Sequence, residues 1–175
     1  NAAKLAASGD YAQLAASGNY AQLAASGYAA KLTASGDYAQ LAASGNAAKL
    51  AASGDYAQLA ASGDAAKLAA SGYAAKLAAS GYAAQLAASG DDAQLAASGN
   101  AAKLDNTGAR GIMAGIGVNN KARGKVGCWL ILAEHEDTKD GWRVKNVQTT
   151  RIDGKKIKAD TYYALQDGKF VEDND

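Results

Sequence analysis

Leucine recurs at every ninth position over the first 104 residues, and alanine, serine and glycine hold fixed places between the leucines. Twelve leucines keep this spacing without a slip, from Leu5 to Leu104. A glycine stands four residues after each of them, from Gly9 to Gly108. Self-similarity at a fixed period is the sequence signature of a repeat architecture, in which stacked units share one core.

The residues between successive glycines favour a short strand over a helix. Ala, Leu, Lys and Gln are good helix formers, but the Ser-Gly pairs leave helices too short to be stable alone in water. At about 100° per residue, leucines nine apart would also face opposite sides of a continuous helix. Alternation along a strand instead puts Ala3, Leu5 and Ala7 on one face. Gly9 then supplies a positive-φ turn position.

The variable positions indicate two repeats per coil. When residues 18 apart are stacked, lysine and glutamine mostly sort into separate columns. Residues of the same type then lie above one another in successive coils, so that tyrosine rings can pack and amides can form hydrogen-bonded ladders. Three repeats per coil would scramble these columns. The expected columns are the tyrosines Tyr20, Tyr38 and Tyr56, the glutamines Gln22, Gln40 and Gln58, and the lysines Lys31, Lys49 and Lys67.

The repeat decays after Leu104, and a different composition begins at Cys128. Met113 and Ala122 keep the phase, after which the stretch RGKVGCWLILAE slips by one residue and becomes strongly apolar. Three Asp-Gly pairs then separate short segments of apolar pattern, which is a hairpin signal. These residues predict a small antiparallel unit that covers the last coil and its edge.

The predicted fold is therefore all-β: a flat, two-sheet parallel β-solenoid of 18 residues per coil with a small antiparallel β cap at the C-terminus. The expected domains are a solenoid over residues 1–127, regular to 104 and degenerate over 105–127, and a capping unit over 128–175. Burying one leucine contributes about 1.5–3 kcal/mol, which ordering nine backbones offsets. One coil cannot stand alone, so stability must come from stacking.

The ending GCWLILAE…VQTTRIDGKKIKADTYYALQDGKFVE, behind repeats of the type AASGDYAQL, resembles a group of uncharacterised bacterial and phage nonapeptide-repeat proteins. The resemblance covers the whole chain and is most specific in the C-terminal stretch. It implies the solenoid fold and a bacterial or phage source, and it implies no activity and no catalytic residues. Members of the group often begin with a separate N-terminal domain of unknown function, so we expect that such a domain can precede this chain.

Composition and charge exclude several classes. Eighteen basic residues oppose seventeen acidic ones, so we expect no nucleic-acid binding through phosphate neutralisation. No apolar run reaches membrane-spanning length, and we expect no membrane partner. With one cysteine, no internal disulfide is possible and the redox compartment stays open. The sequence leaves the cellular location unknown.

Candidate chemistry is sparse, and we expect no catalytic residue, cofactor or metal. The residue after each glycine is Asp, Asn or Tyr, and a column interrupted by tyrosines does not supply the six to eight oxygens that Ca²⁺ requires. The trio Glu134-His135-Glu136 alternates sides of a strand and lacks a placed nucleophile or a second histidine. Cys128 reads as a buried small residue. The glycine-rich stretch 108–117 lacks the Lys-Ser/Thr end of a phosphate loop.

We therefore expect a non-enzymatic structural or interaction module, a rod that acts as a spacer or self-associates into dimers or fibrils through its uncapped N-terminal edge. A flat-face binder of an anionic surface or of ice is the alternative, with the Lys31, Lys49 and Lys67 column as the candidate face. The regular threonine rows of an ice-binding face are absent, since Thr33 is the only threonine in the repeats. A stalk for a separate N-terminal domain is a further alternative.

Overall fold

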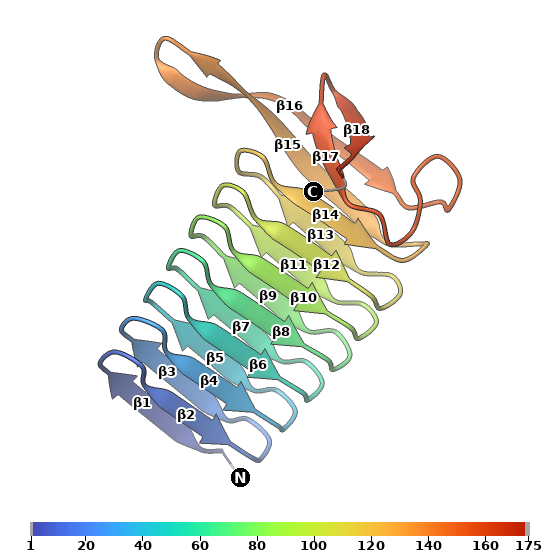
Figure 1. Cartoon of the computed structure of the whole chain (residues 1–175). Coiled ribbons are helices and arrows are strands. Elements are labelled where there is room, and N and C mark those ends of the chain that lie inside the picture. The colour runs from blue at the N-terminus through green and yellow to red at the C-terminus, as the bar shows by residue number, and fades with distance from the viewer. Residues whose placement is uncertain (1, 174–175) are drawn as a thin grey trace.

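The computed structural model describes residues 2–173, which form eighteen strands in two sheets (Figure 1). In spatial order the first sheet contains β1 (Lys4–Ser8), β3 (Gln22–Ser26), β5 (Gln40–Ala43), β7 (Gln58–Ala61), β9 (Lys76–Ala79), β11 (Gln94–Ala97), β13 (Ile112–Gly115), β15 (Trp129–Thr138) and β16 (Gly141–Arg151). The second contains β2 (Gln13–Ala16), β4 (Lys31–Ala34), β6 (Lys49–Ala52), β8 (Lys67–Ala70), β10 (Gln85–Ala88), β12 (Lys103–Asn106), β14 (Lys121–Gly124), β17 (Tyr163–Gln166) and β18 (Lys169–Glu172). Within this part of the chain, no helix is long and apolar enough to cross a membrane.

Successive strands alternate between the two sheets, so each coil contributes one strand to each. Every strand from β1 to β12 pairs in parallel with the strand two places further along the chain, as in Lys4↔Gln22 and Leu50↔Leu68. The side-chain hydrogen bonds that join neighbouring coils at the corners span the same separation, |i−j| = 18. The two-sheet parallel β-solenoid with two nonapeptides per coil, predicted from the columns, is confirmed, and Figure 1 shows the coils stacked into a rod.

The core is a thin layer of leucine and alanine between the sheets. In the inner coils, each strand alternates exposed and buried positions, with its leucine and final alanine facing inward, as in β5. A further alanine at each corner, such as Ala39, is also fully buried. The first coil lacks a neighbour on one side, and Leu5 is accordingly 37% exposed while Leu23, one coil later, is 2% exposed. Burial of the leucines therefore depends on the adjacent coils.

Glycine is required at the corners because consecutive coils come into close contact there. From Gly27 to Gly117, a Cβ added at any repeat glycine would clash with the backbone of the glycine one coil earlier. At Gly63, the clash is with the carbonyl group of Gly45. The residue type is thus fixed by the approach of two backbones.

The glycine has a positive φ only at the first three corners. The expectation that glycine supplies the positive-φ turn position holds for the first three repeat glycines, with φ of 138° to 144°, and is wrong from Gly36 onward, where φ lies outside that region. Instead, the second residue after each glycine has φ between 51° and 63°, in every coil from Tyr11 to Asn119. This conformation costs about 1–2 kcal/mol for an L-residue. It directs the N–H toward the next coil, as where Tyr20 donates to the carbonyl of Asp37 at 2.8 Å.

Strand β15 joins the solenoid to the cap. Its first four residues pair in parallel with β13, and Trp129 lies opposite Ile112. Trp129 follows its partner Ile112 by 17 residues, one fewer than the 18 residues between Gln94 and Ile112, as the slip in the sequence requires. On its other side β15 pairs antiparallel with β16 along its whole length. The sheet is therefore continuous across the boundary expected between residues 127 and 128, and the outer part of the β15–β16 hairpin extends beyond the rod (Figure 1).

The second sheet ends in a different way. A single antiparallel bridge joins Ala122 of β14 to Tyr163 of β17, which pairs with β18 as a hairpin. Tyr163 and Leu165 are buried over the end of the core, beside Ile152. The predicted antiparallel C-terminal unit is thus present, and it covers the last coil.

The corner contact predicts that Gly63→Ala will lower the free energy of unfolding by about 1–3 kcal/mol, the usual cost of overpacking. Ser62→Ala, at the exposed neighbouring position, is the matched control and should leave stability unchanged. Urea denaturation followed by circular dichroism measures both. Equal stability of Gly63→Ala and the wild type would contradict the proposed backbone contact.

Candidate interaction surfaces

The lysine column lies on the outward side of the second sheet. Lys31, Lys49 and Lys67 are in register on β4, β6 and β8, and all three are exposed. Gln13 and Gln85 bound the column at its two ends. No ion pair engages these lysines among residues 2–173, so they form a row of like charges facing solvent.

The tyrosine column lies at the corner that follows β2, β4 and β6. The rings of Tyr20 and Tyr38 stack with centroids 5.0 Å apart and an interplanar angle of 6°, and Tyr38 stacks on Tyr56 in the same way. Tyr73 stands one residue before position 74, where the column would continue. Its ring makes an edge contact with the ring of Tyr56, with centroids 5.6 Å apart. The 5.0 Å between the centroids of the stacked rings is close to the spacing of the strands, about 4.8 Å.

The glutamine column lies on the outward side of the first sheet. Gln22, Gln40 and Gln58 are in register and exposed. No hydrogen bond joins their amides to one another in the described part of the chain. The structure therefore brings them together as a row of neutral polar side chains without forming an amide ladder.

Asp and Asn at the corners form inter-coil hydrogen bonds that the sequence did not reveal. The side chain of Asn46 accepts from the backbone N–H of Asp64 at 2.9 Å, and Asp64 accepts from Tyr82 N–H at 2.8 Å. We call these contacts the corner rungs; others involve Asp10, Asn19, Asp37, Asp55, Asp91 and Asn100. The sequence indicated that Asp and Asn stand at these positions because they favour turns. In the structure, their side-chain oxygens accept hydrogen bonds from backbone N–H groups 18 residues later, in the next coil.

The candidate catalytic trio is split by the strand, and its glutamate has a structural role. Glu134 accepts hydrogen bonds from Lys145 Nζ at 2.9 Å and Asn146 Nδ2 at 2.7 Å. It also accepts from the backbone N–H groups of Asp167 at 2.9 Å and Gly168 at 2.8 Å. Glu134 thereby ties the β15–β16 hairpin to the turn between β17 and β18.

These donors favour the charged carboxylate of Glu134. The bonds from Asn146 and Lys145, followed by that from Gly168, lower the pKa of Glu134 from 4.5 to about 2. Glu134 and Asp167 in turn raise the pKa of Lys145 to about 12. Glu134 is thus a negatively charged link within the cap at neutral pH.

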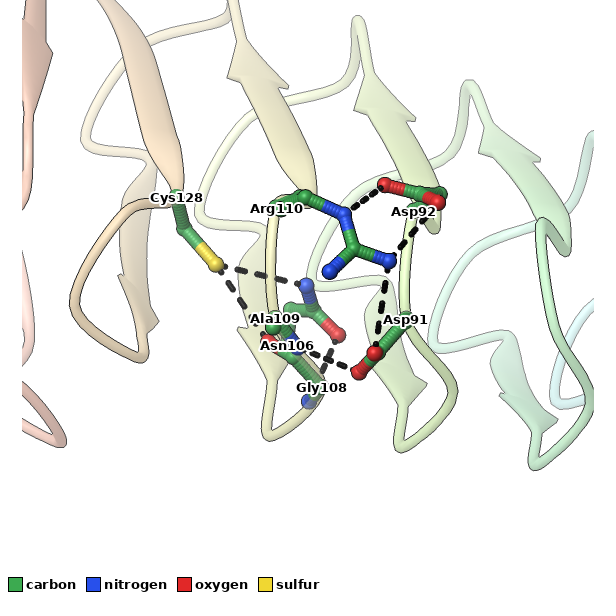
Figure 2. A network of polar contacts seen from close by, with 7 residues as sticks. All are labelled: Asp91, Asp92, Asn106, Gly108, Ala109, Arg110 and Cys128. Atoms are coloured by element: carbon green, nitrogen blue, oxygen red, sulfur yellow. Dashed lines mark hydrogen bonds and ion pairs between the residues drawn. The ribbon is translucent and has the colours of Figure 1, made fainter.

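Cys128 and Asn106 form a buried polar network where the repeats end (Figure 2). The Asn106 amide donates to Cys128 Sγ at 3.6 Å and accepts from Gly108 N–H at 3.1 Å. The Cys128 thiol donates to the Gly108 carbonyl at 3.3 Å. Asn106 stands where earlier coils have an inward alanine, and these bonds satisfy its amide inside the core.

An ion-pair cluster lies on the surface next to this network (Figure 2). Arg110 Nε donates to Asp92 at 2.9 Å, and Arg110 Nη2 lies 3.4 Å from Asp91. The bond from Arg110 is the main cause of the lowered pKa of Asp92. The stretch 108–117, which contains Arg110, forms a corner and strand β13. The ion pairs of Arg110 with Asp91 and Asp92 join two consecutive coils.

The first coil presents an unpaired strand edge. In later coils, the N–H groups that start each strand donate to the preceding coil, as Gln22 does to Ala3 at 2.7 Å and Lys31 does to Ala12 at 2.8 Å. The equivalent donors in the first coil belong to Lys4 and Gln13, and among residues 2–173 no earlier coil precedes them. This edge is therefore a row of backbone groups open to another strand.

Within residues 2–173, no group of three or more His, Cys, Asp or Glu side chains is arranged to hold a metal ion. The chain matches no protein-family model, no curated protein and no solved structure. A proposal of function therefore rests on the geometry of the described residues, a rod whose first coil is uncovered and whose side faces are flat.

The corner rungs predict a stabilising substitution. Tyr82 stands at a corner-rung position but has neither a carboxylate nor an amide. In the described part of the chain, the backbone N–H of Asn100, one coil later, therefore has no side-chain acceptor at this position. Tyr82→Asn supplies the missing acceptor and should raise the free energy of unfolding by about 0.5–1.5 kcal/mol, the net value of one hydrogen bond. Tyr82→Ala is the control that removes the ring without adding an acceptor. If the two variants unfold at the same urea concentration, the rungs do not stabilise the stack.

The lowered pKa of Glu134 predicts an acid-dependent cap. A carboxylate with a depressed folded-state pKa stabilises fully above its unfolded value, 4.5, and the contribution is lost as pH falls toward about 2. Glu134→Gln should therefore lower the melting temperature at neutral pH and flatten its fall between those two pH values. Glu136→Gln, at an exposed position of the same strand, is the control. A melting profile of Glu134→Gln that parallels the wild type would contradict the role assigned to Glu134.

Proposed function

We propose that the chain is a non-enzymatic structural module: a rigid β-solenoid rod, covered at its C-terminal end, that joins a second copy through its open N-terminal edge. The β-solenoid fold fits a rod-like structural module. The observation that carries the proposal is the difference between the two ends. At the C-terminal end, β17 and β18 and the β15–β16 hairpin cover the end of the core, although β16 and β18 are themselves the last strands of their sheets. At the other end, within residues 2–173, no element covers the first coil, and Leu5 is 37% exposed.

The composition of the rod supports a structural role over a catalytic one. Its outward positions repeat alanine, serine, glutamine and lysine from coil to coil. Catalysis requires a concave site in which groups of different chemistry converge. A surface that repeats itself with every coil offers the same environment many times and is suited to spacing or assembly.

The open edge supports self-association. Its backbone donors on β1 and β2 are aligned for another strand, and Leu5 of the first coil is only partly covered. Two copies that meet edge to edge would pair these donors with carbonyl groups and bury both leucines. Natural sheets usually protect such edges with proline, inward charges or a covering segment, and the chain contains no proline.

The edge contact predicts that the protein self-associates and that Gln13→Pro weakens this association about tenfold, because each copy loses one backbone hydrogen bond. Gln13 is the first residue of β2, a position where a strand tolerates proline. Gln13→Ala keeps the N–H and is the matched control. Sedimentation velocity over a range of protein concentrations measures the association. A wild type that stays monomeric throughout, or a Gln13→Pro variant that associates as well as Gln13→Ala, would overturn the proposal.

A further inference from the structure

The outward side of the first sheet, here called the A face, is nearly uncharged over the length of the solenoid, with a column of alanine between a column of serine and a column of mostly glutamine. It consists of the outward residues of β1, β3, β5, β7, β9, β11 and β13. Two shallow grooves of about 940 Å³ and 820 Å³ run along it, on either side of the alanine column that includes Ala42 and Ala60. Serines border one groove and glutamines border the other.

Large apolar side chains stand at the C-terminal end of the A face. Ile116 lines the end of the serine-bordered groove and Ile112 the end of the glutamine-bordered groove. Trp129 of β15 is in register with Ile112. The side chains of Ile116, Ile112 and Trp129 are 52%, 40% and 44% exposed, respectively. Exposed apolar groups that form one continuous surface mark an interaction site.

The same surface continues onto the projecting hairpin. Alternation from Trp129 along β15 places His135 and Asp137 on its side of the strand, opposite Val144 and Trp142 of β16. Both Val144 and Trp142 are exposed. The surface therefore continues from the alanine column of the solenoid to the tip of the hairpin, and on the hairpin Val144 and Trp142 lie among the polar residues His135, Asp137 and Arg151.

The two sides of the rod differ in charge. In the seven coils, the A face carries only Lys4 and Lys76, and no acidic residue. The outward side of the second sheet, here called the B face, carries the lysine column and is covered at its end, where the ring of Tyr162 lies 4.6 Å from the Arg123 guanidinium. Facing rows of lysine repel one another. Lys31, Lys49 and Lys67 form such a row on the B face, whereas the central coils of the A face carry the single lysine Lys76.

The solenoid part of the A face reaches the lower limit for a specific protein interface. Seven strands about 4.8 Å apart and five residues rising about 3.3 Å each give roughly 550 Å² on each copy, or about 1,100 Å² in total. A specific interface buries at least about 1,000 Å² in total. The contact therefore needs all seven strands, and the β15–β16 hairpin projects beyond it.

The geometry points to a second copy of this chain as the occupant of the A face, packed face to face with the two rods antiparallel. A second copy has the same coil spacing, so side chains of the two faces remain in step along their entire length. A two-fold axis parallel to the strands places each groove opposite its own equivalent. Ile116 of one copy then enters the alanine-lined N-terminal end of the partner's groove, where Ala6 and Ala7 leave space.

This contact is separate from the open edge and does not rest on it. The edge pairs backbone groups at the end of the rod, whereas the A face pairs side chains along its length. An edge contact is therefore sensitive to Gln13→Pro and insensitive to charges on the A face. A contact through the A face is instead weakened by charges placed on that face and is unaffected by Gln13→Pro. Failure of either proposal therefore leaves the other testable.

The test places two lysines on the middle of the A face, in a Gln13→Pro background that weakens the edge contact. Ala42→Lys with Ala60→Lys changes two exposed alanines of β5 and β7, and burying unpaired charges should raise the dimer dissociation constant at least about 100-fold. Ala51→Lys with Ala69→Lys makes the same change at the equivalent exposed positions of the B face. Sedimentation velocity of the background and of this control should show a species of twice 17.6 kDa, and the A-face variant should be monomeric. Circular dichroism confirms that all three fold alike.

A crosslinking experiment tests the antiparallel geometry. In a Cys128→Ser background, Ala60→Cys lies at the centre of the A face and should form a disulfide-linked dimer on mild oxidation. Ala24→Cys, two strands nearer the N-terminal end, would be separated from its copy by about 19 Å in the antiparallel pair and should not. Crosslinking of both variants indicates parallel rods and overturns the geometry.

Three other outcomes would overturn the proposal itself. They are a Gln13→Pro protein that stays monomeric at submillimolar concentration, equal loss of dimer in the A-face and B-face variants, and a monomer that cosediments with phosphatidylcholine vesicles through the A face. The last result would assign the surface to lipid instead of a second copy.

Discussion

Each coil of this protein is held in place by the backbone of its neighbours. The corner glycines let consecutive backbones approach more closely than any side chain would allow, and the left-handed residue two positions after each glycine directs its N–H toward the next coil. The leucines fill the space that this stacking encloses. Because the contact recurs in the same form along the rod, the structure tolerates a core made almost entirely of leucine and alanine.

This repetition separates the roles of the ends from those of the sides. At the C-terminal end, the antiparallel strands and the Glu134 contacts replace the neighbour that a further coil would supply. At the N-terminal end nothing within residues 2–173 replaces it. The sides differ by a choice of residue at one outward position, mostly lysine on one sheet and mostly glutamine on the other. A small change in composition thus gives a symmetrical scaffold two chemically distinct faces.

The fold could be read from the sequence because the columns of like residues are themselves a record of which residues stack. The leucine period indicated the inward side of each strand, and the segregation of lysine from glutamine indicated the length of one coil. What the sequence did not reveal were the contacts made with the backbone of a neighbouring coil. The role of the glycines depends on the backbone of the preceding coil, and the corner rungs of Asn46 and Asp64 likewise join one coil to the next.

The candidate surfaces were only partly accessible to the same reasoning. Lys31, Lys49 and Lys67 were placed in one column because their spacing is regular. The apolar C-terminal part of the A face was not, because the one-residue slip before Trp129 hides its register with Ile112. The position of Glu134 between two hairpins was also hidden, since its partners Lys145 and Gly168 are distant in sequence and come from different strands and turns.

The alternation of strands between two sheets has a consequence for how such a chain can change its length during evolution. Duplication or loss of two nonapeptides moves everything downstream by one full lap and preserves each column. Duplication of a single nonapeptide would transfer every later strand to the opposite side, mixing lysine with glutamine and presenting the cap to the wrong sheet. Rods of this type should therefore differ in even numbers of nonapeptides, although the unit visible in the sequence is only one.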